Sequence, residues 1–498
     1  MTESQQNTKI AGDIVLYGLG GVLSQAAGLI TLPLIVRTLT AVEYGTIETI
    51  SAATGYFSLL IGLNILYGVY RYYYEYEKDL NEQQKIVSTA IFFTFFCGII
   101  LALFAFPLSS RLSQNLFQSD KNRQFILMSF FAMIPMAIYN YTLGLLRLKR
   151  QALAYILSSL AVSLMYLFSI VIFIDQLRLG IRGFYYAQIL SYGLGIVITM
   201  FLSRELLTFS ISLNWLKRLA KYSIPLVPST FFIWSIGANT RLFLNTYTDA
   251  ARVAYYVFAS KLSFLVTLFT QAFNSAWEPT KYSLLNNEEQ LKKKLPSILS
   301  IYTFTTFAVS IFLLVIAREA YLLLAPPEYL IGIGLLGIIG VRWLFTIGVC
   351  IIDPGTAKTG KTYLVSLALG IAVVINMIAN RLLLPTFGIE GAAVAELIGF
   401  AVAMIIRWLI SNHLFPIHWD VKYFVMSLGV YALIAVTITR VTLSNLPIIW
   451  SVALRFILLI GFIFIEFYLL DRNSRRELVS TIQSFATRLQ RFTSREKK

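Results

Sequence analysis

The chain has 498 residues, of which 57% are hydrophobic and only 13% are charged. Ordinary soluble domains carry about 25% charged residues, so this composition excludes a soluble globular fold and predicts a polytopic membrane protein. The net charge of +16 would suggest a nucleic-acid partner for a soluble protein. In a membrane protein an excess of Lys and Arg in the inner loops accounts for it, so nucleic acid is excluded as a partner.

Apolar stretches long enough to cross a bilayer follow one another along the chain. A spanning helix needs about 20 mostly apolar residues. Fourteen stretches meet this requirement, roughly at 12–37, 44–70, 86–107, 124–146, 152–174, 180–203, 221–246, 251–276, 296–317, 331–352, 361–384, 388–410, 421–440 and 449–470. We therefore expect an all-α polytopic membrane protein with about 14 transmembrane helices.

The distribution of Lys and Arg predicts the orientation of these spans. With the N-terminus inside, the inner segments carry 26 of the 41 basic residues, the outer loops 10 and the spans five. Such a bias follows the positive-inside rule, and fourteen spans then place both termini in the cytoplasm.

An internal repeat divides the spans into two sets. Leu179–Ile196 (LGIRGFYYAQILSYGLGI) aligns with Phe387–Met404 (FGIEGAAVAELIGFAVAM) at an offset of 208, and further weaker matches follow nearly the same offset. Two six-helix copies in the same orientation are related by an axis along the membrane normal, with a binding site expected between them near the midplane.

The repeat predicts five segments with different roles. An N-lobe (1–204) and a C-lobe (221–412) hold six helices each, and an amphipathic interfacial helix (205–220) links them. Two additional helices (413–470) precede a basic cytoplasmic tail (471–498) that we expect to lie on the anionic inner leaflet.

Metal, disulfide and nucleotide sites are not expected. The two cysteines, Cys97 and Cys350, both lie in apolar runs, and His413 and His418 have no third ligand nearby. The segment GTAKTGKT (355–362) matches the P-loop expression, but it lies between two spans rather than between a buried strand and a helix. We expect Lys358 and Lys361 to be cytoplasmic anchors, with no nucleotide and no other cofactor.

Several local motifs carry a family resemblance. The opening segment GDIVLYGLGGVLSQAAGLITLPLIVRTLTAVEYGTIETI (12–50) is a Gly-rich helix that ends at a proline-containing turn followed by an L-T-x-x-E-Y-G motif. RYYYE (71–75), DAARVAYYVFASK (249–261) and two G-I-x-G span openings continue the pattern. Together they resemble the multidrug/oligosaccharidyl-lipid/polysaccharide exporter superfamily, and within it the Wzx-type O-antigen flippases of polysaccharide biosynthesis.

The resemblance implies a transporter rather than an enzyme. Such a flippase moves a polyprenyl-diphosphate-linked oligosaccharide from the cytoplasmic to the outer face of a bacterial cytoplasmic membrane by alternating access of two rocking lobes. Candidate protein partners are a polysaccharide polymerase and a chain-length regulator. A lipid II flippase and a multidrug/cation antiporter are the alternatives within the superfamily. A membrane glycosyltransferase is disfavoured because no long loop carries catalytic carboxylates.

Charged residues inside spans are expensive and mark functional cavities. For an anionic diphosphate we expect cations, first Arg241 and Lys261 at the start of the C-lobe, then Arg71, Arg37 and Arg342. The alternative for Arg241 or Lys261 is a structural ion pair with Glu48, and for Arg342 one with Glu396. Arg37 and Arg71 have the alternative role of interfacial anchors.

Uncharged polar residues in the spans are candidates for sugar contacts: Gln25, Asn64, Gln271 and Asn274. Interhelical hydrogen bonding is their alternative role. Glu48 and Glu396 are the titratable candidates for coupling transport to an ion gradient.

Overall fold

The computed structural model describes residues 28, 30–76, 79–263, 265–271, 273, 277, 288–359, 361, 363–480 and 483. Within these ranges all regular secondary structure is helical, which confirms the predicted fold class. Gln25 and Asn274, two of the predicted sugar contacts, lie outside the described residues.

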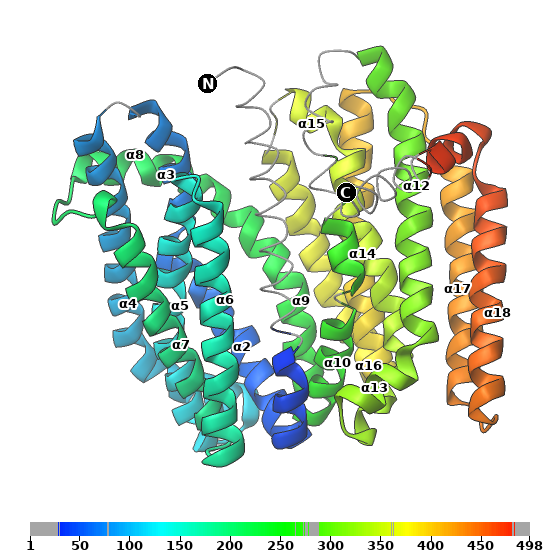
Figure 1. Ribbon diagram of the computed structural model, residues 1–498, viewed down its shortest axis with the longest axis horizontal. Helices are drawn as coiled ribbons and strands as arrows, with labels where there is room; N and C mark the ends of the chain where they lie inside the picture. The colour runs from blue at the N-terminus through cyan, green and yellow to red at the C-terminus, as the bar shows by residue number, and fades with distance from the viewer. Residues whose placement is uncertain are drawn as a thin grey trace, which may run out of the picture. The chain divides into compact units, whose positions relative to one another are not determined.

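The helices follow one another with short connections (Figure 1). The α-helices are α2 (Ala41–Gly62), α3 (Ile65–Tyr73), α4 (Leu80–Phe117), α5 (Arg123–Leu148), α6 (Ala152–Ile170), α7 (Ile181–Leu202), α8 (Leu213–Ser223), α9 (Val227–Tyr247), α10 (Ala250–Leu262), α12 (Glu288–Val315), α13 (Ala317–Leu324), α14 (Leu335–Ile352), α15 (Pro354–Thr359), α16 (Tyr363–Leu414), α17 (Val421–Leu443) and α18 (Ile448–Leu469). A π-helical turn, η3 (Val171–Gln176), continues α6.

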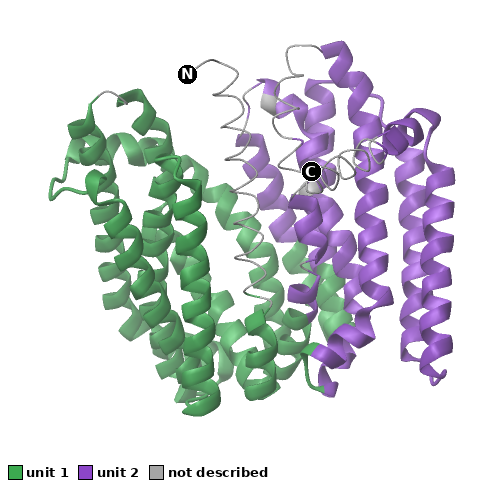
Figure 2. Cartoon of the chain, viewed as in Figure 1, with its two compact units in different colours: residues 1–258, 324–326, 376–395 green, residues 259–323, 327–375, 396–498 purple. Residues whose placement is uncertain are grey.

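The chain separates into two compact units (Figure 2). Unit 1 comprises Met1–Phe258, Leu324–Pro326 and Asn376–Ala395, and unit 2 comprises Ala259–Leu323, Pro327–Ile375 and Glu396–Lys498. This grouping reflects contacts and does not test a duplication. The predicted lobes, linker and tail therefore stay a prediction.

Within unit 1, α5 packs against α4 and α7, and α7 packs against α6. α2 packs against α5 on one side and against α9 on another. At one end of the unit, a cluster of buried side chains that includes Ile65, Tyr141 and Trp215 joins α3, α4, α5 and α8. Within unit 2, α12 packs against α14, α17 and α18.

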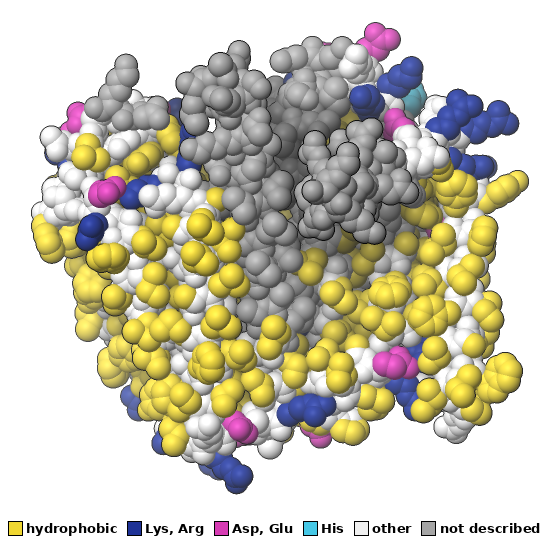
Figure 3. Space-filling view, in the orientation of Figure 1, with side chains coloured by type: hydrophobic (Ala, Val, Ile, Leu, Met, Phe, Trp, Pro, Cys, Tyr) yellow, Lys and Arg dark blue, Asp and Glu magenta, His cyan; other side chains and the backbone are white. Residues whose placement is uncertain are grey.

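The exposed helix faces are those of a membrane protein. Ten helices of the described part are long and apolar enough to cross a membrane, or up to eleven if the bent pair Ala250–Leu262 and Leu265–Gln271 is one span. Over each unit, apolar side chains cover the sides of the helices, and most charged side chains lie towards the helix ends (Figure 3). The chain is therefore a multi-pass membrane protein, while the count of fourteen spans stays a prediction.

The G-I-x-G motifs shape two helix junctions in the same way. Gly180 before α7 has φ 57° and ψ −134°, and Gly388 within α16 has φ 55° and ψ −128°. Side chains strongly disfavour positive φ, so glycine is required at both turns. The second glycine of each motif, Gly183 and Gly391, meets a backbone carbonyl of the preceding helix at a distance that leaves no room for a Cβ atom. The break at Gly388 divides the 52 residues of α16 into two helices.

Candidate functional site

Arg241 of α9 and Glu48 of α2 form an ion pair inside unit 1. Arg241 Nη1 lies 3.3 Å from Glu48 Oε2, and only 20% and 8% of the two side chains are exposed. Arg241 Nε donates to the carbonyl oxygen of Gly237, and the guanidinium lies 5.5 Å from the centre of the Trp234 ring. A buried charge requires a partner of opposite sign, which each residue supplies to the other.

Further polar contacts flank this pair along the contact between α2 and α9, which we call the α2–α9 seam. Tyr56 Oη donates to Asn239 Oδ1 at 2.7 Å. Thr49 Oγ1 donates to Asn245 Oδ1 at 3.4 Å, and Asn245 Nδ2 in turn donates to the carbonyl oxygen of Leu116 in α4 at 2.8 Å. Polar bonds between helices fix the register of two apolar helices, because slippage would leave each group without a partner.

Asn64, a predicted sugar contact, also lies on the α2–α9 seam. It occupies the left-handed region at φ 58° in the break between α2 and α3, and its Nδ2 donates to Thr230 Oγ1 of α9 at 3.0 Å. Asn64 therefore forms an interhelical hydrogen bond, which is the alternative to a sugar contact for such residues.

Two glycines of α2 let the helices approach closely. A Cβ atom on Gly45 would overlap the backbone carbonyl of Ala250, and one on Gly55 would overlap the ring of Trp234. Gly45 is therefore confined by backbone, which cannot move aside as a flexible side chain can.

Unit 2 contains a second intramembrane pair of the kind predicted as an alternative. Arg342 Nη1 of α14 lies 2.8 Å from Glu396 Oε1 of α16, with 11% and 4% of the side chains exposed. The Arg342 guanidinium also lies 4.6 Å from the centre of the Trp343 ring. Trp343 Nε1 donates to Ser263 Oγ at 3.0 Å, which places the indole.

A buried and a half-buried arginine of unit 2, Arg455 and Arg407, are committed to structural contacts. Arg455 of α18 is 1% exposed, bonds both carboxylate oxygens of Glu319, and donates to the carbonyl oxygens of Ser451 and Val315. Arg407 donates from Nε and Nη2 to Asp353 Oδ2 at 3.0 and 2.6 Å.

The remaining predicted residues have other surroundings within their own units. Arg71 is exposed, 5.1 Å from the ring centre of Tyr222 and 4.0 Å from a carboxylate oxygen of Glu75. Arg37 is exposed and lines a polar cavity of about 370 Å³ with Glu43 and Arg178. Lys261 and Gln271 are exposed residues of unit 2.

A cluster of uncharged polar residues beside Arg241 is absent from the sequence-based candidates. Asn376 and Asn380 of α16 are fully buried, and both amides donate to Thr240 Oγ1, at 3.5 and 3.3 Å. Asn376 Nδ2 also donates to the carbonyl oxygen of Ala395. Amide side chains inside an apolar helix are the sequence signal that would have revealed this cluster.

Residues 355–359 of the P-loop-like segment belong to a short helix, α15 (Pro354–Thr359). The Gly355 amide donates to Ser411 Oγ at 2.9 Å, and a Cβ atom at Gly355 would overlap the Ser411 backbone. Lys358 forms an ion pair with Glu288 of α12. A phosphate-binding loop needs its backbone amides for the phosphates, so the contact of the Gly355 amide favours a packing role.

We expect Gly355→Ala to lower the thermal melting midpoint of the purified protein by several degrees, because the added methyl group meets backbone. Lys361→Ala, at the position of the P-loop lysine, is expected to leave the midpoint unchanged. Differential scanning fluorimetry with and without ATP and Mg²⁺ measures both effects. A stabilisation of the wild type by ATP that is lost in Lys361→Ala would contradict the packing role.

Comparison with known protein families assigns this chain to one of them. The family described as "Polysaccharide biosynthesis protein" matches residues 34–329, more than half of the chain. The chain belongs to the polysaccharide biosynthesis protein family. This confirms the resemblance to the polysaccharide branch of the exporter superfamily.

Three further similarities agree with this family membership. The probable low-salt glycan biosynthesis flippase Agl15 of Haloferax volcanii is 27% identical over 192 residues, which are 38% of this chain and 40% of that protein. The chain thus matches less than half of the length of this relative. The lipid II flippase MurJ in an inward closed conformation has a similar fold, with a TM-score of 0.69, 14% identity, and coverage of 91% of this chain and 98% of that one. The Vibrio cholerae MATE transporter VcmN has a TM-score of 0.57, 16% identity, and coverage of 82% and 97%.

Proposed function

We propose that this family member is a flippase for a lipid-linked glycan and that its cargo is a polyprenyl-diphosphate-linked oligosaccharide repeat unit. It moves the cargo from the cytoplasmic to the outer face of a bacterial cytoplasmic membrane by alternating access, for O-antigen or related surface polysaccharide. The family match over residues 34–329 and the similarity to a glycan flippase support this proposal.

The observation that carries the proposal is the state of Arg241. Arginine has five N–H donors, and the contacts of Arg241 engage Nε with Gly237 and Nη1 with Glu48. Nη2 makes no hydrogen bond to any described residue. A half-buried arginine with an unused donor can take an anionic oxygen, and a diphosphate offers several. Arg455 differs, because it is 1% exposed and makes four hydrogen bonds that engage Nε, Nη1 and Nη2.

The carboxylates disfavour the antiporter alternative. An organic cation needs acidic groups that are available to it, but Glu48 and Glu396 each face an arginine in the described structure. A lipid II flippase would also carry an anionic diphosphate. The glycan that accumulates in a deletion strain distinguishes this alternative from the proposed function.

The same geometry suggests a coupling step. The diphosphate and Glu48 compete for Arg241, and a Glu48 carboxylate that is displaced from Arg241 takes up a proton, because it is desolvated and has lost the guanidinium. Binding of the diphosphate is therefore accompanied by the uptake of a proton. Glu396 beside Arg342 is proposed to act in the same manner in unit 2.

We expect the affinity of the wild type for a soluble polyprenyl-diphosphate analogue to fall as pH rises, because binding takes up a proton. Glu48→Gln is expected to remove this pH dependence. Glu43→Gln on the same helix is the matched control, since glutamine can replace Glu43 in the capping box with Thr40. Isothermal titration at several pH values, in buffers of different ionisation enthalpy, measures the proton uptake. An unchanged pH slope in Glu48→Gln would remove Glu48 from coupling.

The remaining residue roles and the topology are part of the same proposal. Lys261, Arg71, Arg37 and Arg342 are proposed to meet the diphosphate at other stages, and Gln25, Asn64, Gln271 and Asn274 to meet the sugars. Both termini are proposed to be cytoplasmic, and a polymerase and a chain-length regulator are the proposed protein partners.

Deletion of the gene tests the proposed function most directly. We expect the strain to lose its surface polysaccharide and to accumulate the lipid-linked repeat unit on the cytoplasmic side, since synthesis of the unit continues while its export stops. Mass spectrometry of lipid extracts identifies the accumulated glycan. A normal polymer with no accumulated intermediate would contradict the flippase proposal.

A further inference from the structure

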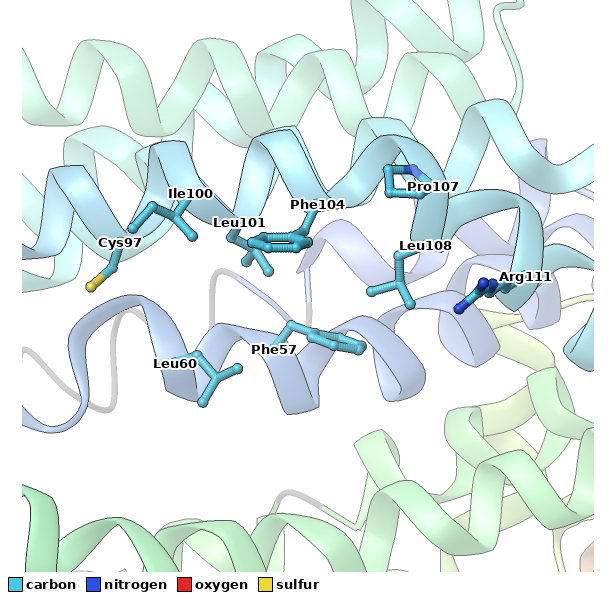
Figure 4. A pocket seen from close by; sticks show the side chains of 9 residues that line it. All are labelled: Phe57, Leu60, Cys97, Ile100, Leu101, Phe104, Pro107, Leu108 and Arg111. Atoms are coloured by element: carbon cyan, nitrogen blue, oxygen red, sulfur yellow. The ribbon is translucent and has the colours of Figure 1, made fainter.

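An apolar groove runs between α2 and α4 on the outside of unit 1. Figure 4 shows Phe57 and Leu60 of α2 facing a row of α4 side chains that extends from Cys97 to Arg111. The cavity has a volume of about 440 Å³, and its lining residues are Phe57, Leu60, Cys97, Ile100, Leu101, Phe104, Pro107, Leu108 and Arg111. Arg111 is the one charged residue of this lining.

The walls of the groove are apolar and exposed. Phe104 is 63% and Leu60 is 51% exposed, and on a membrane-spanning helix we infer that such side chains meet hydrocarbon chains. The floor is closed, since Leu101 is only 7% exposed. On the far side of α4, Gly98 lies against Ile134, so that α4 packs closely against α5.

The length and direction of the groove match one leaflet. From Cys97 to Arg111, α4 advances fourteen residues, which is about 21 Å at 1.5 Å per residue. Half of the hydrocarbon core measures about 15 Å, so the groove spans roughly one leaflet and reaches the headgroup region. With the predicted orientation, α4 runs outwards, and Arg111 lies at the outer surface.

Arg111 is positioned for an anionic headgroup. Its side chain is exposed and, among the described residues, it has no ion pair and no hydrogen bond. A cation at the end of a hydrocarbon groove complements a molecule with a single chain and a phosphate at one end. A phospholipid brings two chains per phosphate, whereas an isoprenoid carrier brings one, which fits a single groove.

We propose that this groove holds the isoprenoid chain of the lipid carrier in the outer leaflet, with Arg111 bound to its terminal phosphate. The inference rests on the proposed function and extends it to a product-side lipid site, separate from the Arg241–Glu48 pair. The chain would be held there after the diphosphate has crossed, before the lipid leaves the protein.

Cys97 provides a probe at the inner end of the groove. In a Cys350→Ala background, Cys97 is the single thiol of the chain. We expect a long-chain polyprenyl diphosphate in proteoliposomes to slow labelling of Cys97 by a lipid-soluble maleimide by about fivefold or more, and Arg111→Ala to raise the half-protecting concentration about tenfold. Arg123→Ala, an exposed outer arginine outside the groove, is expected to behave as the parent does.

Steric variants test the groove independently of charge. Leu60→Trp fills the groove and is expected to abolish the ligand-dependent protection, while Leu103→Trp, on α4 but outside the lining, is expected to retain it. Equal protection by phosphatidylglycerol would overturn the proposal in favour of an ordinary phospholipid site. Absence of protection in the parent would also overturn it. Flipping of a fluorescent lipid-linked glycan is measured separately in the same vesicles. If Cys97 is not protected but flipping is intact, the groove proposal is wrong and the proposed function is unaffected.

Discussion

Replacing Arg241 with alanine is expected to abolish transport. The change removes the half-buried guanidinium that pairs with Glu48, together with its charge-assisted contact to the diphosphate, a loss of about 2–3 kcal/mol or roughly 30- to 150-fold in binding. It also leaves Glu48 as a buried carboxylate without Arg241 beside it. Translocation of a lipid-linked glycan in proteoliposomes measures the effect directly, and restoration of surface polysaccharide in a deletion strain measures it in the cell.

Controls separate loss of a ligand contact from loss of folding. Arg241→Ala alone could misfold, because an unpaired buried charge destabilises a protein by several kcal/mol. The double variant Arg241→Gln with Glu48→Gln leaves a neutral, hydrogen-bonding pair of similar size, so we expect it to fold and still to lack transport. Arg241→Lys keeps the charge but not the planar fork, and we expect partial activity. Transport at the wild-type rate in the folded double variant would remove Arg241 from the binding site.

The second large effect is expected at Gly45. Its Cβ position is occupied by the backbone carbonyl of Ala250, so even alanine forces α2 away from the segment that begins α10. Overpacking of this kind destabilises a protein by about 1–3 kcal/mol or more when backbone must shift. We expect Gly45→Ala to reduce the yield of monodisperse protein and to lower its melting midpoint.

Gly193→Ala on α7 is the matched control, since nothing lies within 4 Å of its Cβ position. It is expected to be neutral or slightly stabilising, because alanine favours a helix over glycine. Size-exclusion chromatography of heated samples compares the two variants. Equal melting midpoints for Gly45→Ala and Gly193→Ala would show that the approach at Gly45 is looser than the structure has it.

Much of the fold could be predicted because the bilayer imposes it. Each spanning segment must satisfy its own backbone hydrogen bonds in hydrocarbon, so an apolar run of sufficient length becomes a helix. The G-I-x-G openings were recognised in the sequence as repeated features, and the structure shows their physical reason in the positive φ of Gly180 and Gly388.

The pairing of charges could be predicted only as alternatives. Glu48 was considered as a partner of Arg241 or of Lys261, and sequence alone cannot rank them, because the choice depends on how two helices 193 residues apart are rotated against each other. The Thr240, Asn376 and Asn380 cluster was missed for the same reason. Amides inside spans mark hydrogen bonds between helices, but their partners appear only when the helices are packed.

The break between α2 and α3 also escaped prediction. Leu63 and Asn64 adopt positive φ values of 43° and 58° inside a stretch that reads as one continuous span. Gly62 and Asn64 are residue types that tolerate such a break, but they lie inside a continuous apolar run that favours an uninterrupted helix. The Asn64 bond to Thr230 is formed at this break, which indicates that tertiary contact stabilises the conformation.

The Arg455 contacts have a consequence for the order of assembly. Glu319 and the Val315 carbonyl lie about 136 to 140 positions ahead of Arg455 in the chain and are inserted into the membrane long before it is synthesised. Until α18 is synthesised, the Val315 carbonyl and the Glu319 carboxylate lack their contacts to Arg455. Unit 2 can therefore complete these contacts only after α18, near the end of the chain, has been synthesised. A chain truncated before α18 would lack them, and membrane quality control would meet an incompletely packed unit 2.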